Sequence, residues 1–125
     1  MGNYGEGEGR EIVNTNDSKP SVFIVTGMHR SGTSLTASLF QKVGVDIGQK
    51  LVGPADGNVK GHFENVDFVE FHKSVLRSHD IDELGCTFEK TIPVAAKYVE
   101  IAKKLIAKNQ QTHKHWGWKD PRSAL

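Results

Sequence analysis

This sequence has a single cysteine, no long apolar run and almost no excess of either charge. The single cysteine, Cys86, excludes an internal disulfide, and because no motif surrounds it we expect a buried or incidental thiol rather than a reactive one. The 125 residues carry a net charge of +1, and Lys and Arg are spread along the chain. The sequence therefore predicts no basic patch of the kind that binds a nucleic acid backbone. No apolar run approaches the length needed to span a bilayer.

The N-terminal segment also lacks targeting signals. It has no apolar stretch of the secretory type, and Glu6 stands where an N-myristoylation motif requires Ser or Thr. Met1–Ser18 is rich in Gly, Glu and Asn, so we expect residues 1–20 to form a flexible tail. Residues 21–125 are long enough for one small domain. Together these absences predict a cytoplasmic protein.

The first pattern after the tail predicts a strand, a loop and a helix. Val22–Val25 is a continuous apolar run, typical of a strand covered on both faces in a parallel sheet. A helix is expected from about Gly32 to Val43, with Gly44 as its C-terminal cap. Its apolar stripe is expected to comprise Leu35, Leu39 and Val43, with Phe40 beside them.

The rest of the chain predicts two more helices and a second strand. After a loop over Val45–His62, one helix is expected over about Val66–Ser78 and another from Pro93 to Lys108. Their inward residues are expected to be Val66, Val69, Leu76 and either Phe68 or Phe71 in the first, and Val94, Tyr98, Ala102, Leu105 and Ile106 in the second. Trp116–Lys119 is predicted to be a short strand broken by Pro121.

These elements predict an α/β fold, a P-loop-type parallel sheet with flanking helices. Two interior-type parallel strands cannot bury both faces or close their edges. We therefore expect residues 21–125 to be the N-terminal part of a three-layer α/β/α domain, either as a fragment of a longer chain or as a truncated relative. Alone, the chain is expected to be weakly stable or prone to aggregation.

The loop between the first strand and helix carries the chemistry. In Thr26–Ser34, four residues separate Gly27 from Gly32, and a hydroxyl pair and a helix follow, which is the spacing of a P-loop. In such a turn several backbone N–H groups converge on the positive end of the helix dipole, so a phosphate is the natural ligand. Glycines allow the backbone angles and the close approach that this geometry needs.

One departure distinguishes this loop from that of a nucleotide triphosphatase. Thr33, followed by Ser34, occupies the place after the second glycine where those enzymes have Lys. The cation is Arg30, whose planar guanidinium can make paired hydrogen bonds to a phosphate or sulfonate. No Asp at the end of a second apolar strand is a convincing magnesium ligand, so we expect a site that works without a metal.

The stretch Gly27–Ser34 resembles the 5′-phosphosulfate-binding loop of the sulfotransferase family, especially its bacterial members. Asn58–Asn65 is similar to the segment that those enzymes place after the first helix, and Trp116–Arg122 to their next strand end. The resemblance spans about Val22–Arg122. It implies a sulfuryl donor, 3′-phosphoadenosine 5′-phosphosulfate, and a hydroxyl or amine acceptor on a small molecule, carbohydrate or peptide.

The same resemblance implies roles for individual residues. Arg30 would assist the leaving group, Lys119 would neutralise the sulfonate, and Glu64 is the first choice for the catalytic base. The donor would be bound by the loop residues Gly27, His29, Arg30, Ser31, Gly32, Thr33 and Ser34, although His29 is also a candidate for the acceptor pocket. Removal of one such cation should raise the barrier by about 3 kcal/mol.

Alternatives remain open at several positions. His62 is a second candidate base, and Glu64 is alternatively an acid that complements a helix dipole. Lys119 and Arg122 are alternatively surface residues or partners of Asp120. The other histidines are expected to be ordinary surface or packing residues: His72, His79, His113 and His115. Competing functions are a P-loop nucleotide kinase or nucleotidase and a non-catalytic anion-binding module.

Overall fold

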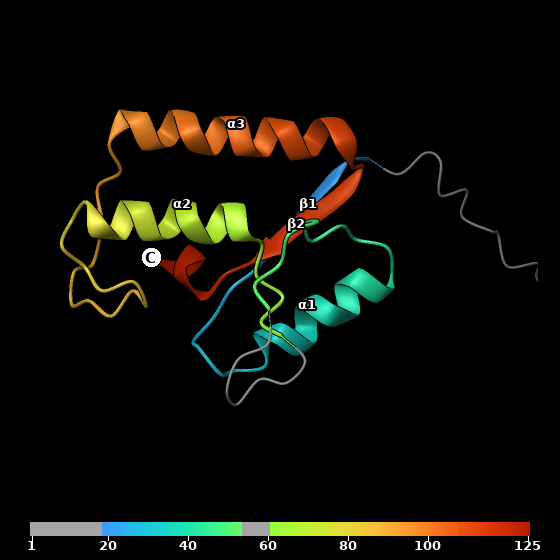
Figure 1. Ribbon diagram of the computed structural model, residues 1–125, viewed down its shortest axis with the longest axis horizontal. Helices are drawn as coiled ribbons and strands as arrows, with labels where there is room; N and C mark the ends of the chain where they lie inside the picture. The colour runs from blue at the N-terminus through green and yellow to red at the C-terminus, as the bar shows by residue number, and fades with distance from the viewer. Residues whose placement is uncertain (1–18, 54–60) are drawn as a thin grey trace, which may run out of the picture.

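A computed structural model describes residues 19–53 and 61–125, which form an α/β arrangement with one two-stranded parallel sheet (Figure 1). The elements, in chain order, are β1 (Ser21–Val25), α1 (Thr33–Lys42), α2 (Val66–Arg77), α3 (Ala96–Thr112), β2 (His115–Lys119) and the 3-10 turn η2 (Pro121–Ala124). Within these ranges, no helix combines the length and apolar character needed to cross a bilayer. The predictions for Met1–Ser18 and for Asn58, Val59 and Lys60 lie outside the described residues.

The two strands run side by side, so their carboxyl ends meet at one edge. Ser21 lies opposite His115, and Val25 lies opposite Lys119. The pairing continues one step past the strands, where the Asp120 amide donates to the Val25 carbonyl at 3.1 Å. The loop that follows β1 and the turn that follows β2 therefore leave the sheet next to each other.

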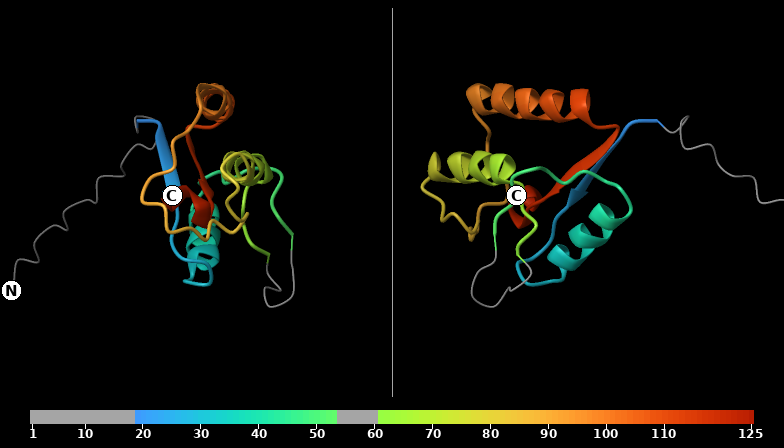
Figure 2. Two further views of the ribbon diagram at one scale, coloured as in Figure 1. Left: turned by 90° about the vertical axis from the view of Figure 1, so that its left-hand side faces the viewer. Right: turned by 45° about the vertical axis from the view of Figure 1, so that its right-hand side comes forward.

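Helices cover both faces of this small sheet. The helix α1 packs on one face, and α2 and α3 lie together on the other (Figures 1 and 2). The core on the second face joins Phe68 of α2 to Trp116 and Trp118 of β2, with Leu105 and Ile106 of α3 against it. Phe68 stacks on Trp118 with ring centroids 4.2 Å apart, so Phe68 rather than Phe71 is the inward phenylalanine of α2.

The ends of α1 confirm the prediction, but its buried face does not. The helix begins after Gly32 and ends before Val43, and Gly44 follows with φ 94°. The predicted stripe points outward, as Leu35, which is 66% exposed, illustrates, and Leu39 and Val43 are exposed with it. The inward face instead carries the small residues Thr33 and Ala37, which let the helix lie close to the sheet.

Strand β1 is not covered on both faces, contrary to the prediction. Val22 and Ile24 share the face of the two tryptophans, but α2 and α3 pack on β2, and Ile24 remains 54% exposed. Within the described residues, the side chains of Val22 and Ile24 therefore lie at the exposed edge of this face of the sheet. A continuous apolar run therefore predicted the strand correctly and its burial wrongly.

Two local predictions also need correction. The helix α3 begins at Ala96, not at Pro93, because Ala95 has extended backbone angles and the Pro93 carbonyl is hydrogen-bonded to the His79 ring at 2.7 Å. Val94 consequently lies before the helix and is exposed. Cys86 lies exposed in the irregular segment between α2 and α3, so of the two expected alternatives, a buried or an incidental thiol, the buried one does not apply.

Candidate anion-binding site

The loop after β1 is a tight turn built from left-handed backbone angles. Gly27, Arg30 and Gly32 have φ values of 147°, 66° and 91°. The amide and the hydroxyl of Ser31 both donate to the Met28 carbonyl, at 3.2 and 2.6 Å. This turn reverses the chain at the sheet edge and starts α1 directly afterwards.

The first turn of α1 has neither a side-chain cap nor an acidic residue of its own, and Gly32 is its N-cap residue. The leading amides and the positive end of the helix dipole consequently have no carboxylate partner from their own helix. Thr33 is buried at this end, and the Ser34 hydroxyl donates to the His62 carbonyl at 3.2 Å.

A cavity of about 320 Å³ opens in front of this helix end. It is lined by residues of the loop and α1, of the segment before α2, and of the end of β2: His29, Arg30, Gly32, Thr33, Ser34, His62, Glu64 and Lys119. The three residues predicted to be catalytic, Arg30, Glu64 and Lys119, thus share one cavity. Gly27 and Ser31 do not line it; they shape the turn behind it.

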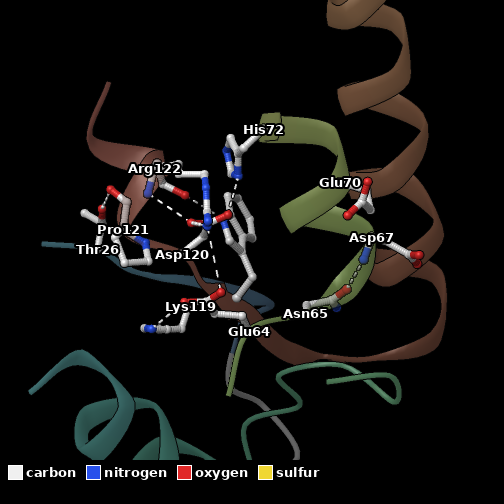
Figure 3. Close-up of polar contacts among 12 residues, drawn as sticks. Thr26, Glu64, Asn65, Asp67, Glu70, His72, Lys119, Asp120, Pro121 and Arg122 are labelled. Carbon is white, nitrogen blue, oxygen red and sulfur yellow. Dashed lines mark hydrogen bonds and ion pairs between the residues drawn. The ribbon is translucent and has the colours of Figure 1, made fainter. Parts of the chain in front are cut away.

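Lys119 and Glu64, which both line the cavity, form a buried ion pair (Figure 3). The Lys119 Nζ lies 2.7 Å from the Glu64 Oε1, and the two side chains are 4% and 9% exposed. The strand β2 delivers Lys119, while Asn65, whose side chain caps α2 by accepting from the Asp67 amide, fixes the chain next to Glu64. Lys119 is therefore neither a surface residue nor a partner of Asp120.

Behind this pair, Arg122, Asp120 and His72 continue the network (Figure 3). The Arg122 Nη1 lies 3.8 Å from the Glu64 Oε2 and 2.8 Å from the Asp120 Oδ1, which also accepts from the Arg122 amide at 3.0 Å. The other Asp120 oxygen lies 2.9 Å from the His72 Nδ1. Asp120 is fully buried. The chain of contacts runs from the cavity wall into the interior.

The pKa of Asp120 reports how well this network holds a negative charge. Burial by itself raises the pKa of that carboxyl group. Hydrogen bonds from His72 and from the Arg122 amide, together with the charges of both residues, outweigh burial and leave the pKa below its ordinary value. Asp120 is therefore a stable anion that fixes the Arg122 guanidinium.

The sequence patterns missed His72 and Asp120 as members of the site. The prediction for His72 was an ordinary surface or packing residue, and its pairing with Asp120 joins positions 48 residues apart. Asp120 did carry a local signal: an Asp before Pro121 and Arg122 is typical of a side chain that caps the turn after it. That signal predicts the cap but not the buried charge network.

The donor chemistry of the cavity suits an anion rather than a metal ion. Asp120 follows the second strand directly, where a magnesium ligand would lie, but its two oxygens are engaged by Arg122 and His72. Across residues 19–53 and 61–125, no three metal-ligating side chains gather in one place. Amides, hydroxyls, Arg30 and Lys119 are instead the groups that bind phosphate and sulfonate oxygens.

Comparison of the chain with protein-family models, with curated proteins and with solved structures found no match. The interpretation of the site therefore depends on its own geometry. A helix N-terminus, two hydroxyl residues, two cations and one carboxylate surround a single cavity. Such a set can hold an oxyanion and, through the carboxylate, accept a proton beside it.

Proposed function

We propose that the chain is a sulfotransferase, or the N-terminal part of one, with a P-loop-type sheet. It would bind the phosphosulfate end of 3′-phosphoadenosine 5′-phosphosulfate in the cavity and transfer the sulfuryl group to a hydroxyl or amine acceptor. The observation that supports this most is the convergence of Arg30, from the loop, and Lys119, from the neighbouring strand end, on the start of α1. The cavity volume is within the usual range for small-molecule sites.

Each group of the cavity has a task in this reaction. The amides and hydroxyls at residues 32–34, which line the cavity, hold the 5′-phosphate, and Arg30 interacts with the oxygen that bridges phosphorus and sulfur. Lys119 neutralises the sulfonate oxygens as charge redistributes in the transition state. The sulfuryl group carries less negative charge than a phosphoryl group, so side-chain cations supply the stabilisation that phosphoryl transfer takes from magnesium.

Glu64 is the proposed general base. A new S–O or S–N bond forms to the acceptor while the bond from sulfur to the bridging oxygen breaks. The acceptor's proton passes to Glu64, and adenosine 3′,5′-bisphosphate leaves. Glu64 lines the cavity together with Lys119, which places a proton acceptor beside the cation that would hold the sulfonate.

The test is transfer of radiolabelled sulfate from the donor to a panel of alcohols, carbohydrates, amines and a tyrosine peptide, with a metal chelator present. Transfer should be about a hundredfold slower in Arg30→Met, since one charge-stabilising donor is removed. The matched control is Arg77→Met, because Arg77 is an exposed guanidinium on α2, away from the cavity. It should leave transfer unchanged.

The competing functions give different outcomes in the same experiment. Magnesium-dependent ATP hydrolysis with no sulfuryl transfer would identify a nucleotide kinase or nucleotidase. Binding of adenosine 3′,5′-bisphosphate with no transfer to any acceptor would identify a non-catalytic anion-binding module. Either result contradicts the sulfotransferase proposal.

A further inference from the structure

The Lys119–Glu64 pair poses a problem for any anion that enters the cavity. Lys119 is the buried cation of the cavity wall, yet its ammonium is 2.7 Å from a carboxylate oxygen. An anion that draws the Lys119 ammonium further into the cavity weakens its contact with Glu64. That exchange would strand Glu64 as a buried carboxylate, which is strongly unfavourable unless another cation replaces Lys119.

A second cation is already aimed at Glu64. The Arg122 Nη1 lies 3.8 Å from the Glu64 Oε2, the oxygen that Lys119 does not bind. This distance is an ion pair but is too long for a hydrogen bond. Glu64 therefore stands between two cations, bound closely to one and loosely to the other.

We propose that Arg122 is a positioning residue that takes over Glu64 when a phosphate or sulfonate anion draws Lys119 into the cavity. The exchange rests on the proposed function of this cavity as an oxyanion site. Arg122 does not line the cavity and so acts through Glu64 rather than by touching the ligand. It lets Lys119 change partners while the buried carboxylate stays neutralised.

The setting of Arg122 suits this task. Asp120 binds both its amide and its Nη1, and the Glu83 carbonyl accepts from its Nε, so the side chain is held in one place while it faces Glu64. A guanidinium keeps its charge at all accessible pH values and has five N–H donors, enough to serve Asp120 and Glu64 together. His72 holds the other oxygen of Asp120 and prevents that carboxylate from turning away.

The charge balance of the network supports the same exchange. In the described structure, Glu64 and Asp120 carry two negative charges against Lys119 and Arg122. If Lys119 turns to the anion, Arg122 is the cation that still contacts both carboxylates, whereas His72 contacts Asp120. Anion affinity should consequently depend on Arg122 only as long as position 64 carries a negative charge.

A double-mutant cycle tests this dependence. Binding of inorganic pyrophosphate to the full chain is measured by titration calorimetry for the parent, Arg122→Gln, Glu64→Gln and the double variant. We expect Arg122→Gln to weaken binding about tenfold, within the usual range of coupling between contacting residues. Glu64→Gln should bind at least as tightly as the parent, because Lys119 is released. In the Glu64→Gln background, Arg122→Gln should change the affinity by less than about threefold.

A purely structural role for Arg122 predicts something else. It would weaken binding by the same factor in both backgrounds, and that result overturns the proposal, as does a parent chain that does not bind pyrophosphate. If Arg122→Gln does not fold, Arg122→Lys in both backgrounds gives the same cycle, since Lys cannot make both contacts at once. Sulfuryl transfer is assayed separately. If the chain transfers sulfuryl groups but the effects of the two substitutions on binding are additive, the proposed exchange is wrong and the proposed function stands. If the two effects are coupled but no transfer occurs, the exchange stands and the sulfotransferase proposal is wrong.

Discussion

The cavity has two walls that are built in opposite ways. The loop wall belongs to one short segment, Gly27–Ser34, of which residues 29, 30 and 32–34 line the cavity. The segment is largely exposed, and left-handed backbone angles set the direction of its amides. The network wall comes from Glu64, Lys119 and the side chains behind them, joins residues 55 positions apart, and is buried. Local backbone geometry forms the first wall, and tertiary packing forms the second.

This difference determines how each wall should respond to substitution. Backbone amides remain when a side chain changes, so a loop variant should alter ligand affinity with a modest effect on folding. Charges in the network are buried and depend on each other, so loss of one partner leaves another stranded. Variants of the network wall should therefore change stability and function together, and paired variants should separate the two.

The largest effect is expected for Lys119→Met. The variant strands Glu64 inside the protein, so the free energy of unfolding should fall by about 3–5 kcal/mol. Sulfuryl transfer should fall about a hundredfold or more, because the variant removes the cation proposed to stabilise the transition state. Denaturant unfolding and the radiolabel transfer assay measure the two effects.

The double variant Glu64→Gln/Lys119→Met separates stability from catalysis. It should recover much of the lost stability, because no buried carboxylate remains, while transfer stays low. Lys103→Met is the matched control, since Lys103 pairs with Glu100 on the exposed face of α3. If the double variant is as unstable as Lys119→Met alone, the ion pair does not explain the loss.

A smaller effect is expected when Gly32 is changed to Ala, with Gly44→Ala as its match at the other end of α1. Both glycines have φ near 90°, and neither has an atom within 4 Å of an added Cβ. Each substitution should therefore cost about 1–2 kcal/mol of stability from backbone strain alone. Only Gly32→Ala should also weaken pyrophosphate binding, because Gly32 lines the cavity. Equal binding by both variants would show that the loop wall does not hold the anion.

The smallest effect is a pH dependence of stability at Asp120. Its pKa in the folded protein lies below the ordinary value of 3.8, so the folded state binds fewer protons than the unfolded state. Its contribution is full above pH 3.8 and is lost as the pH falls through the folded pKa. The free energy of unfolding of Asp120→Asn should therefore fall less steeply on acidification than that of the parent.

Glu83→Gln provides the matched control for that titration. Hydrogen bonds from Arg77 and Lys73 also lower the pKa of Glu83, but this carboxylate is exposed. Salt should screen its contribution, whereas the buried contribution of Asp120 should persist. If molar salt abolishes both slopes equally, the Asp120 network is not shielded from solvent.

Local patterns predicted most of the elements and went wrong where burial was concerned. The left-handed glycines bracket α1 as expected, and β2 ends at the predicted residue, since these features depend on neighbours in sequence. The outward Leu35 stripe and the exposed Ile24 were predicted wrongly, because the buried face of an element depends on what packs against it. Nothing local distinguishes an apolar residue that meets a helix from one that does not.

The same division applies to the site. The sequence by itself determined the loop wall: two glycines, an arginine and a hydroxyl pair between a strand and a helix define the amide turn through short-range backbone angles. Only the tertiary structure decided that Lys119 pairs with Glu64, and that Asp120 joins Arg122 to His72. Parallel pairing of β1 with β2 and the packing of α2 on the tryptophans bring these charges together, and both depend on contacts between residues far apart in the chain.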